Sequence, residues 1–101
     1  MSRQILSWDQ QFQQGRDACL HAPWTSLRGK SDVFRQGFYE ESSAQLLTGY
    51  THRITAEKFN ESINMWVKIE FSTTRDAVKR HLKALHGANA RNIKAYTFKK
   101  A

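Results

Sequence analysis

Residues 63–100 read INMWVKIEFSTTRDAVKRHLKALHGANARNIKAYTFKK, and the spacing of the apolar side chains changes twice along them. Between residues 63 and 71 every second residue is apolar, which predicts a β-strand with one face on a core. The polar face of the same strand carries Trp66, whose role the pattern leaves open. The residues of the apolar face are Ile63, Met65, Val67, Ile69 and Phe71.

The following residues change to a helical spacing. Ser72 and Thr73 offer hydroxyl groups for an N-cap, and apolar residues then recur at helical intervals over residues 74–86. Gly87 suits the position after the last turn, and alternation returns over residues 92–98, so strand, helix and strand are predicted in succession. The apolar positions of the helix are Val78, Leu82 and Leu85.

The whole net charge of the chain lies in residues 72–101. Residues 1–71 contain eight basic and eight acidic side chains, whereas residues 72–101 contain eight basic side chains and one acid, which gives +7. Charge that served only solubility would be scattered, so we interpret this concentration as a binding surface for a polyanion or an acidic protein. Its candidate contacts are Lys79, Arg80, Lys83, Arg91, Lys94, Lys99 and Lys100.

Length and composition indicate one small folded domain. A chain of 101 residues with 40% hydrophobic content can bury a modest core. The sequence has no signal-peptide core and no apolar run of membrane-spanning length, so we expect no membrane partner and a cytoplasmic location. Cys19 is the single cysteine, which excludes an intramolecular disulfide.

Two helices are predicted in the first half of the chain. Ser7 and Gln10 form a capping-box pattern at the start of a helix over residues 8–21, which carries Gly15 in its interior. Because glycine destabilises a helix interior by about 1 kcal/mol relative to alanine, we expect Gly15 to pack closely against another element. A second helix is predicted over residues 32–47, and a short connection favours an antiparallel hairpin.

Residues 50–57 are interpreted as a strand, although residues 55–60 fit a helical turn equally well. A turn at residues 60–62 then leads into the strand described above. The element order is ααββαβ, which predicts an α+β protein with a helical hairpin, a sheet of two or three strands and one basic helix packed together. We divide the chain into a hairpin, residues 1–49, and a basic ββαβ unit, residues 50–101, which together form one compact domain.

The predicted hairpin contains a Gly-x-x-Ala turn of helix, a central proline and an aromatic-x-x-Gly-aromatic segment. These motifs are Phe12-Gln13-Gln14-Gly15-Arg16-Asp17-Ala18, then Pro23 and Arg28, then Phe34-Arg35-Gln36-Gly37-Phe38-Tyr39-Glu40. Over residues 8–42 they resemble the ribosome modulation factor family. The resemblance implies a two-helix element that docks on the small ribosomal subunit and its RNA during translational silencing.

By position, the resemblance implies that Arg16, Arg28 and Arg35 face RNA. The chain departs from the family pattern in charge, because family members are strongly basic in this element and here carboxylates offset the arginines. Residues 50–101 also have no counterpart in the small family members. The offsetting acids are Asp17, Asp32, Glu40 and Glu41, and the positions that the resemblance marks as structural are Gly15, Ala18, Pro23, Gly37 and Phe38.

No catalytic, metal-binding or cofactor-binding site is predicted. Cys19 and His21 are two residues apart on a helix, and His81 and His86 are five apart, so neither pair shares a face that could hold a metal. The five glycines are widely spaced, so no phosphate-cradling loop is indicated. We therefore do not expect an enzyme.

Two functions fit these observations. The first is a non-enzymatic nucleic-acid- or ribosome-associated regulator, whose basic helix and last strand contact phosphates, with ribosomal RNA as the partner that the resemblance implies. The second is a small bacterial or phage-encoded interaction or inhibitor protein that docks on an acidic or nucleic-acid-binding surface of a host protein, with Trp24 and Trp66 as anchors. Homodimerisation through an edge of the sheet stays open.

Overall fold

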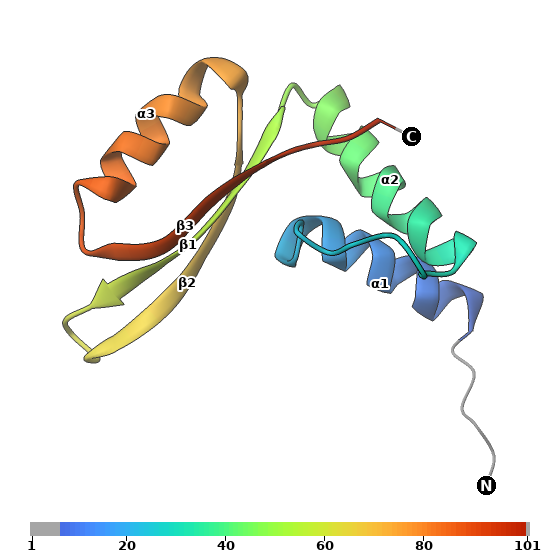
Figure 1. Cartoon of the computed structure of the whole chain (residues 1–101), viewed down its shortest axis with the longest axis horizontal. Coiled ribbons are helices and arrows are strands. Elements are labelled where there is room, and N and C mark those ends of the chain that lie inside the picture. The colour runs from blue at the N-terminus through green and yellow to red at the C-terminus, as the bar shows by residue number, and fades with distance from the viewer. Residues whose placement is uncertain (1–6, 101) are drawn as a thin grey trace, which may run out of the picture. The chain divides into compact units, whose positions relative to one another are not determined.

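The computed structural model describes residues 7–100 and has the α+β architecture and the element order ααββαβ that the sequence predicts (Figure 1). Contacts divide the chain into two units. The hairpin unit runs to Ala44 and also takes in the segment that begins at Lys99, and the sheet unit is Gln45–Phe98. The elements are α1 (Trp8–His21), α2 (Asp32–Leu47), β1 (His52–Asn60), β2 (Met65–Thr73), α3 (Arg75–His86) and β3 (Ala90–Thr97).

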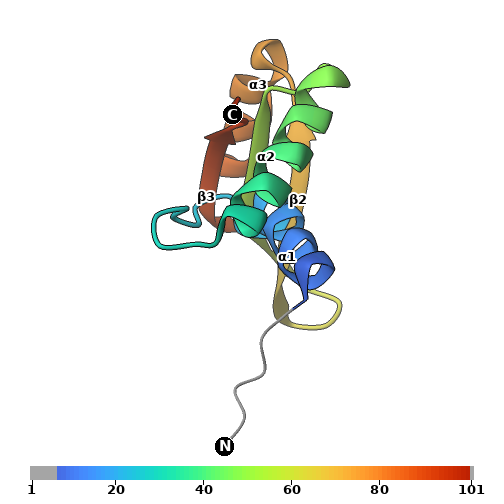
Figure 2. The same cartoon turned by 90° about the vertical axis from the view of Figure 1, so that its right-hand side faces the viewer.

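Two glycines bring α1 and α2 together in the hairpin unit, where Figures 1 and 2 show the helices crossing. A Cβ atom on Gly15 would lie 2.0 Å from the carbonyl oxygen of Phe34, and a Cβ atom on Gly37 would lie 2.0 Å from that of Phe12. Since position 15 meets position 34 and position 12 meets position 37, the helices are antiparallel. The predicted close packing of Gly15 and the predicted hairpin are confirmed.

Side-chain caps fix where the two hairpin helices begin. The backbone N–H of Gln10 donates to Ser7 Oγ at 3.2 Å, and the Gln10 side chain accepts from the Ser7 N–H, so the capping box is confirmed. Ser31 Oγ accepts from the Phe34 N–H at 3.1 Å at the start of α2. Both helices have the bounds that the sequence predicts.

The sheet unit is built around β1, which pairs antiparallel with β2 on one side and with β3 on the other. The strand order β2-β1-β3 makes the two outer strands parallel to each other, so the chain between them must cross β1. All nine residues of β2 pair with β1 in a regular register, whereas a β-bulge interrupts the β1–β3 pairing between Thr55 and Glu57.

The strands begin and end at different residues from those predicted. The turn between β1 and β2 occupies residues 61–64, where Asn64 adopts a left-handed conformation with φ of 54°, and not residues 60–62. Ser72 and Thr73 lie in β2, and Thr74 is the N-cap of α3, accepting from the Ala77 N–H at 3.3 Å. The predicted strands 50–57, 63–71 and 92–98 are replaced by β1, β2 and β3, and the helical turn considered for residues 55–60 is wrong.

One face of the sheet, which we call the helix-covered face, packs against α3. Ile54 pairs with Phe71, and Ala56 pairs with Ile69, so these four side chains share this face. Ile54 and Ala56 are buried, and the Phe71 ring lies 5.0 Å from the ring of His81 on α3. Figures 1 and 2 show α3 running along one face of the sheet.

The apolar row of β2 is covered for only part of its length. Ile69 and Phe71 are half-buried, but Ile63, Met65 and Val67 are 55%, 60% and 41% exposed. A helix of 12 residues is about 18 Å long, which matches about five or six strand residues, so α3 ends before the start of β2. The prediction of a continuous core face along this strand is therefore wrong for its first half.

The Gly15 contact predicts the effect of a methyl group. We expect Gly15→Ala to lower the free energy of unfolding by about 1–3 kcal/mol, because its Cβ would overlap the backbone of Phe34. Gly87→Ala is the matched control: Gly87 has φ of −85° and a Cβ there would meet its nearest atom at 3.5 Å, so alanine should be neutral or stabilising. Urea unfolding followed by circular dichroism measures both, and equal stabilities for the two variants would contradict the close contact.

Candidate nucleic-acid interface

Four cations occupy the outer side of α3, and we call them the α3 ridge. Arg75, Lys79 and Lys83 are four residues apart, so they form one row along the helix, and Arg80 lies beside that row. All four residues are exposed. The half-buried residues Val78, Leu82 and Leu85 face the sheet on the other side of the helix. The predicted assignment of Lys79, Arg80 and Lys83 to the outer face therefore fits the structure, and Arg75 joins them.

The α3 ridge carries four cations and one neighbouring carboxylate, Asp76, which lies three residues before Lys79 and four before Arg80. Within residues 7–100, none of the four cations forms an ion pair. Like charges at a spacing of four residues destabilise a helix by about 0.2–0.5 kcal/mol per pair. The caps at Thr74 and Gly87 and the apolar face of the helix offset that cost, and the ridge stays available to an anionic partner.

The last strand does not extend the α3 ridge. Lys94 pairs with Thr55 and Arg91 pairs with Glu57, which places both cations on the face of the sheet opposite to α3. Lys99 and Lys100 are exposed and belong to the hairpin unit. The predicted surface made of the basic helix and the last strand is thus divided, because β3 presents its cations to the other side of the sheet.

We call that other side the polar face, and Arg91 is already engaged there. Its guanidinium carbon lies 4.1 Å from the centre of the Trp66 ring, and its Nε lies 3.4 Å from Glu57 Oε1. The Trp66 ring also makes an edge contact with Phe59, with 5.3 Å between the ring centres. Trp66 is therefore half-buried, with the Arg91 guanidinium over its ring and the Phe59 ring at its side. Neither Trp66 nor Phe59 forms an open surface on which a base could stack.

A second group of charges on the polar face is also paired. Arg53 donates to Ser72 Oγ at 3.0 Å, and its guanidinium lies 3.7 Å from Glu70. Lys68 Nζ lies 3.1 Å from Glu70 Oε1. These contacts neutralise most of the charge that β1 and β2 carry on this face.

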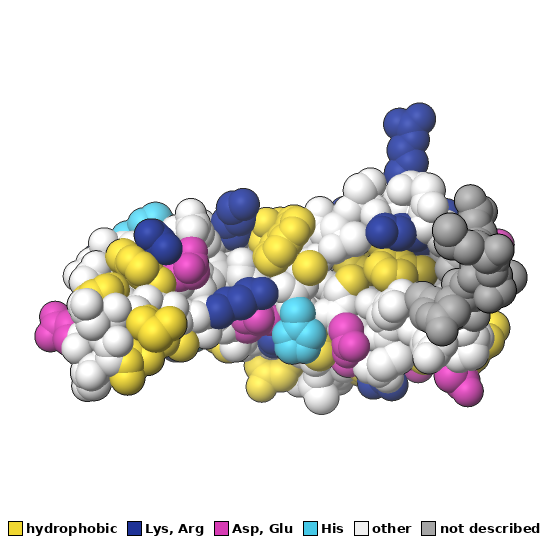
Figure 3. All heavy atoms as spheres, turned by 90° about the horizontal axis from the view of Figure 1, so that it is seen from below, with side chains coloured by type: hydrophobic (Ala, Val, Ile, Leu, Met, Phe, Trp, Pro, Cys, Tyr) yellow, Lys and Arg dark blue, Asp and Glu magenta, His cyan; other side chains and the backbone are white. Residues whose placement is uncertain are grey.

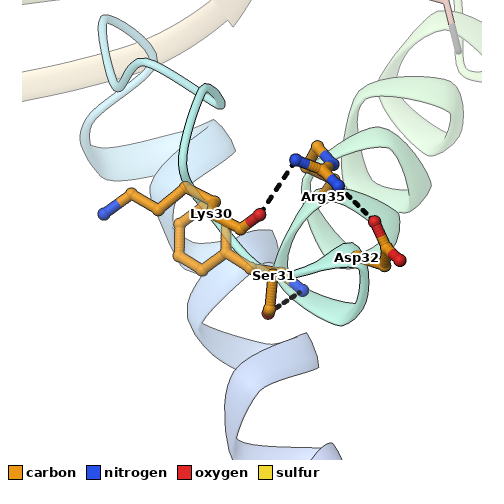
Figure 4. Close-up of polar contacts among 5 residues, drawn as sticks. Lys30, Ser31, Asp32 and Arg35 are labelled. Atoms are coloured by element: carbon orange, nitrogen blue, oxygen red, sulfur yellow. Dashed lines mark hydrogen bonds and ion pairs between the residues drawn. The ribbon is translucent and has the colours of Figure 1, made fainter.

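Of the three arginines that the resemblance marked as RNA-facing, two form ion pairs and one does not. Arg16 pairs with the buried Glu41 across the hairpin at 3.5 Å. Arg35 pairs with Asp32 and donates to the Lys30 carbonyl at 2.9 Å, so it binds the start of its own helix (Figure 4). Arg28 is exposed in the loop between the helices, and it is the one of the three without an ion pair in the described chain.

The cysteine, the possible metal ligands and Trp24 are the remaining residues to place. Cys19 is 1% exposed in the hairpin unit. Among the described residues, no cluster of three or more His, Cys, Asp or Glu side chains could hold a metal ion. None of the helices within residues 7–100 is long and apolar enough to cross a membrane. Trp24 is 52% exposed in the hairpin loop.

Arg75 is the functional candidate that the sequence analysis left out. It sits in the first turn of α3, where a cation is unfavourable beside the positive end of the helix dipole. The signal that could have found it is the spacing of four residues to Lys79 and eight to Lys83. Its position makes the α3 ridge one helical turn longer than the three predicted residues do.

The contacts of Glu57 predict a pH dependence. The Asn92 side chain and then Arg91 donate hydrogen bonds to this carboxylate, and they hold the pKa of Glu57 below its ordinary value of 4.5. The contacts therefore stabilise the fold above pH 4.5, and this contribution is lost as the pH falls through the lowered pKa. We expect Asn92→Gly, which suits the left-handed φ of 53° at this position, to raise the pKa of Glu57 in a carbon-13 NMR titration. An unchanged pKa would contradict the contact.

No protein-family model matches this sequence, and comparisons with curated proteins and with solved structures give no match. A functional proposal for the chain rests on its own residues and contacts.

Proposed function

We propose that this chain is a non-enzymatic nucleic-acid-binding protein and that the α3 ridge contacts phosphates. The observation that carries the proposal is the density of exposed cations on one helix. The four cations of the α3 ridge lie within the 12 residues of α3, none of them forms an ion pair within the described chain, and Asp76 is the one carboxylate of the helix. Other exposed cations without an ion pair there, such as Arg28, Lys58 and Lys94, lie on separate elements. A polyanion would supply the negative charge that α3 lacks.

The length of the α3 ridge suits a phosphate backbone. From Arg75 to Lys83 the helix rises about 12 Å. Phosphates along one strand of a B-form duplex are about 3.4 Å apart along the axis, so the ridge spans about three or four of them. Flexible Lys and Arg side chains reach such phosphates without reading base edges, so the proposed binding is governed by charge more than by sequence.

Ribosomal RNA is the partner that the hairpin resemblance favours, and α3 would supply the contact. The hairpin itself has two of its three candidate arginines in ion pairs, Arg16 with Glu41 and Arg35 with Asp32. Sedimentation with purified small ribosomal subunits addresses this point directly.

Binding to an acidic host protein is the less favoured alternative. Such an interface needs aromatic anchors that become desolvated on binding. Trp66 is already in contact with Arg91 and Phe59, and Trp24 offers one partly exposed ring in a loop. The α3 ridge offers charge without an adjoining apolar anchor on the same side of the helix.

A charge-matched pair of variants tests the proposal. The first is Lys79→Gln, Arg80→Gln and Lys83→Gln together, and the control is Lys58→Gln, Lys94→Gln and Lys99→Gln, which removes the same charge from exposed positions outside α3. Fluorescence anisotropy with a labelled polyuridine RNA of about 20 nucleotides and a DNA duplex of about 20 base pairs measures affinity over a range of salt concentrations. Polyglutamate serves as the acidic polypeptide probe.

We expect the α3 variant to bind both nucleic acids at least about tenfold more weakly and the slope of log affinity against log salt to decrease in magnitude by about 2–3. The control variant should keep most of the affinity and slope. Equal losses in the two variants would show that net charge alone matters and would contradict the α3 ridge as the site. Binding to polyglutamate but not to nucleic acid would favour the acidic protein partner.

A further inference from the structure

β2 is a regular edge strand. It pairs with β1 on one side, and no other strand of the described chain lies on its outer side. Its nine residues carry no bulge and no proline. The opposite edge, β3, is interrupted by the bulge that follows Thr55. Long, regular edge strands present unpaired backbone N–H and C=O groups that another strand can pair with.

The side chains of β2 add apolar surface beside that edge. Met65 and Val67 are 60% and 41% exposed beyond the end of α3, and Ile63 in the adjoining turn is 55% exposed. Figure 3 shows hydrophobic side chains on the surface of the sheet unit, interspersed with Lys and Arg. A partner strand along β2 would cover part of this surface.

The sequence of β2 is complementary to itself when it is reversed. Ile69 is the middle residue of Met65–Thr73. Around it, Lys68 and Glu70 form one pair of flanking positions, and the next pair out consists of the apolar residues Val67 and Phe71. Two antiparallel copies centred on Ile69 therefore place Lys68 of each copy opposite Glu70 of the other, twice in the dimer, so the ion pair that Lys68 and Glu70 form within each chain would extend to a group of four charges across the edge.

We propose that β2 is a homodimerisation edge at which a second copy of the chain adds its own β2 in antiparallel register centred on Ile69. In this register every residue of the strand has a partner, and Val67 lies opposite Phe71 of the second copy. A register centred on Lys68 would instead bring two lysines together, which is destabilising. The Lys68–Glu70 pairs between copies therefore favour a second β2 as the partner strand, and they favour the register centred on Ile69.

The proposed dimer would bring the α3 ridges of both copies to the same side of one sheet. Antiparallel pairing of two edge strands continues one sheet, and its two-fold axis is perpendicular to that sheet, so both α3 helices lie on the same face. The sheet would have six strands with two α3 ridges on one side, which doubles the cations available to a single polyanion. This consequence rests on the proposed nucleic-acid binding, but dimerisation itself does not.

The size of the interface indicates a concentration-dependent dimer. A single pair of nine-residue strands buries less surface than the roughly 1,200 Å² at which standard protein interfaces begin. Such small interfaces are typical of weak association, so dimerisation should be measured over a wide protein concentration range, without nucleic acid. Sedimentation velocity and light scattering detect it directly.

Two charge variants test the register. In Lys68→Glu, each copy presents a glutamate opposite Glu70 of the other, and in Glu70→Lys, each presents a lysine opposite Lys68. Each variant alone should be monomeric at concentrations where the unmodified chain dimerises. Mixed in equal amounts they should form a heterodimer. The introduced glutamate of the first variant would then meet the introduced lysine of the second, and the native Glu70 of the first would meet the native Lys68 of the second.

Lys94→Glu, on the β3 edge, is the control with the same charge change as Lys68→Glu, and it should dimerise as the unmodified chain does. Because Glu70 also pairs with Arg53 and with Lys68 of its own chain, circular dichroism should verify that each variant is folded. Ile69→Cys gives an independent measurement, since position 69 meets itself and should cross-link on oxidation, whereas Val67→Cys should not. A chain that stays monomeric throughout, or a dimer unaffected by Lys68→Glu, would overturn the proposal whether or not nucleic acid binds.

Discussion

The pairing of β1 with both of the other strands is the constraint on which the sheet unit depends. Because β1 lies between β2 and β3, the chain that joins the two outer strands has to cross β1, and α3 makes that crossing on the face that carries Ile54 and Ala56. The apolar side of α3 is used in covering these residues. The opposite side of α3, which carries the α3 ridge, is left exposed. The strand order therefore leaves the four cations of the α3 ridge in contact with solvent.

Charge pairing then separates structural cations from available ones. Arg16 pairs with Glu41 across the hairpin, Arg35 pairs with Asp32 within α2, and Arg53 and Arg91 pair with carboxylates on the polar face of the sheet. A net charge of +7 alone could not distinguish these groups. The geometry does so, because an ion pair within the chain lowers the attraction of that cation for an outside anion.

The sequence predicted the helices well because their signals are local. Capping residues, a helical apolar period and Gly15 depend on neighbours within a few turns, and they gave the right bounds for α1 and α2. The strands were displaced by about two residues, since a two-residue period survives such a shift with its faces unchanged. The left-handed Asn64 and the strand order depend on long-range pairing. The separation of Lys83 from Lys94 onto opposite faces of the sheet followed from that pairing. The pair of Arg35 with Asp32 is local, and its spacing of three residues on α2 was a signal that the sequence already contained.

The central claim is that α3, and not the hairpin, contacts nucleic acid. Amide chemical-shift mapping by NMR during titration with a short polyuridine RNA tests it most directly, because every backbone N–H reports separately. The account predicts the largest changes at Arg75, Lys79, Arg80 and Lys83, decreasing as salt is raised. Changes confined to the loop around Arg28, with α3 unaffected, would contradict it.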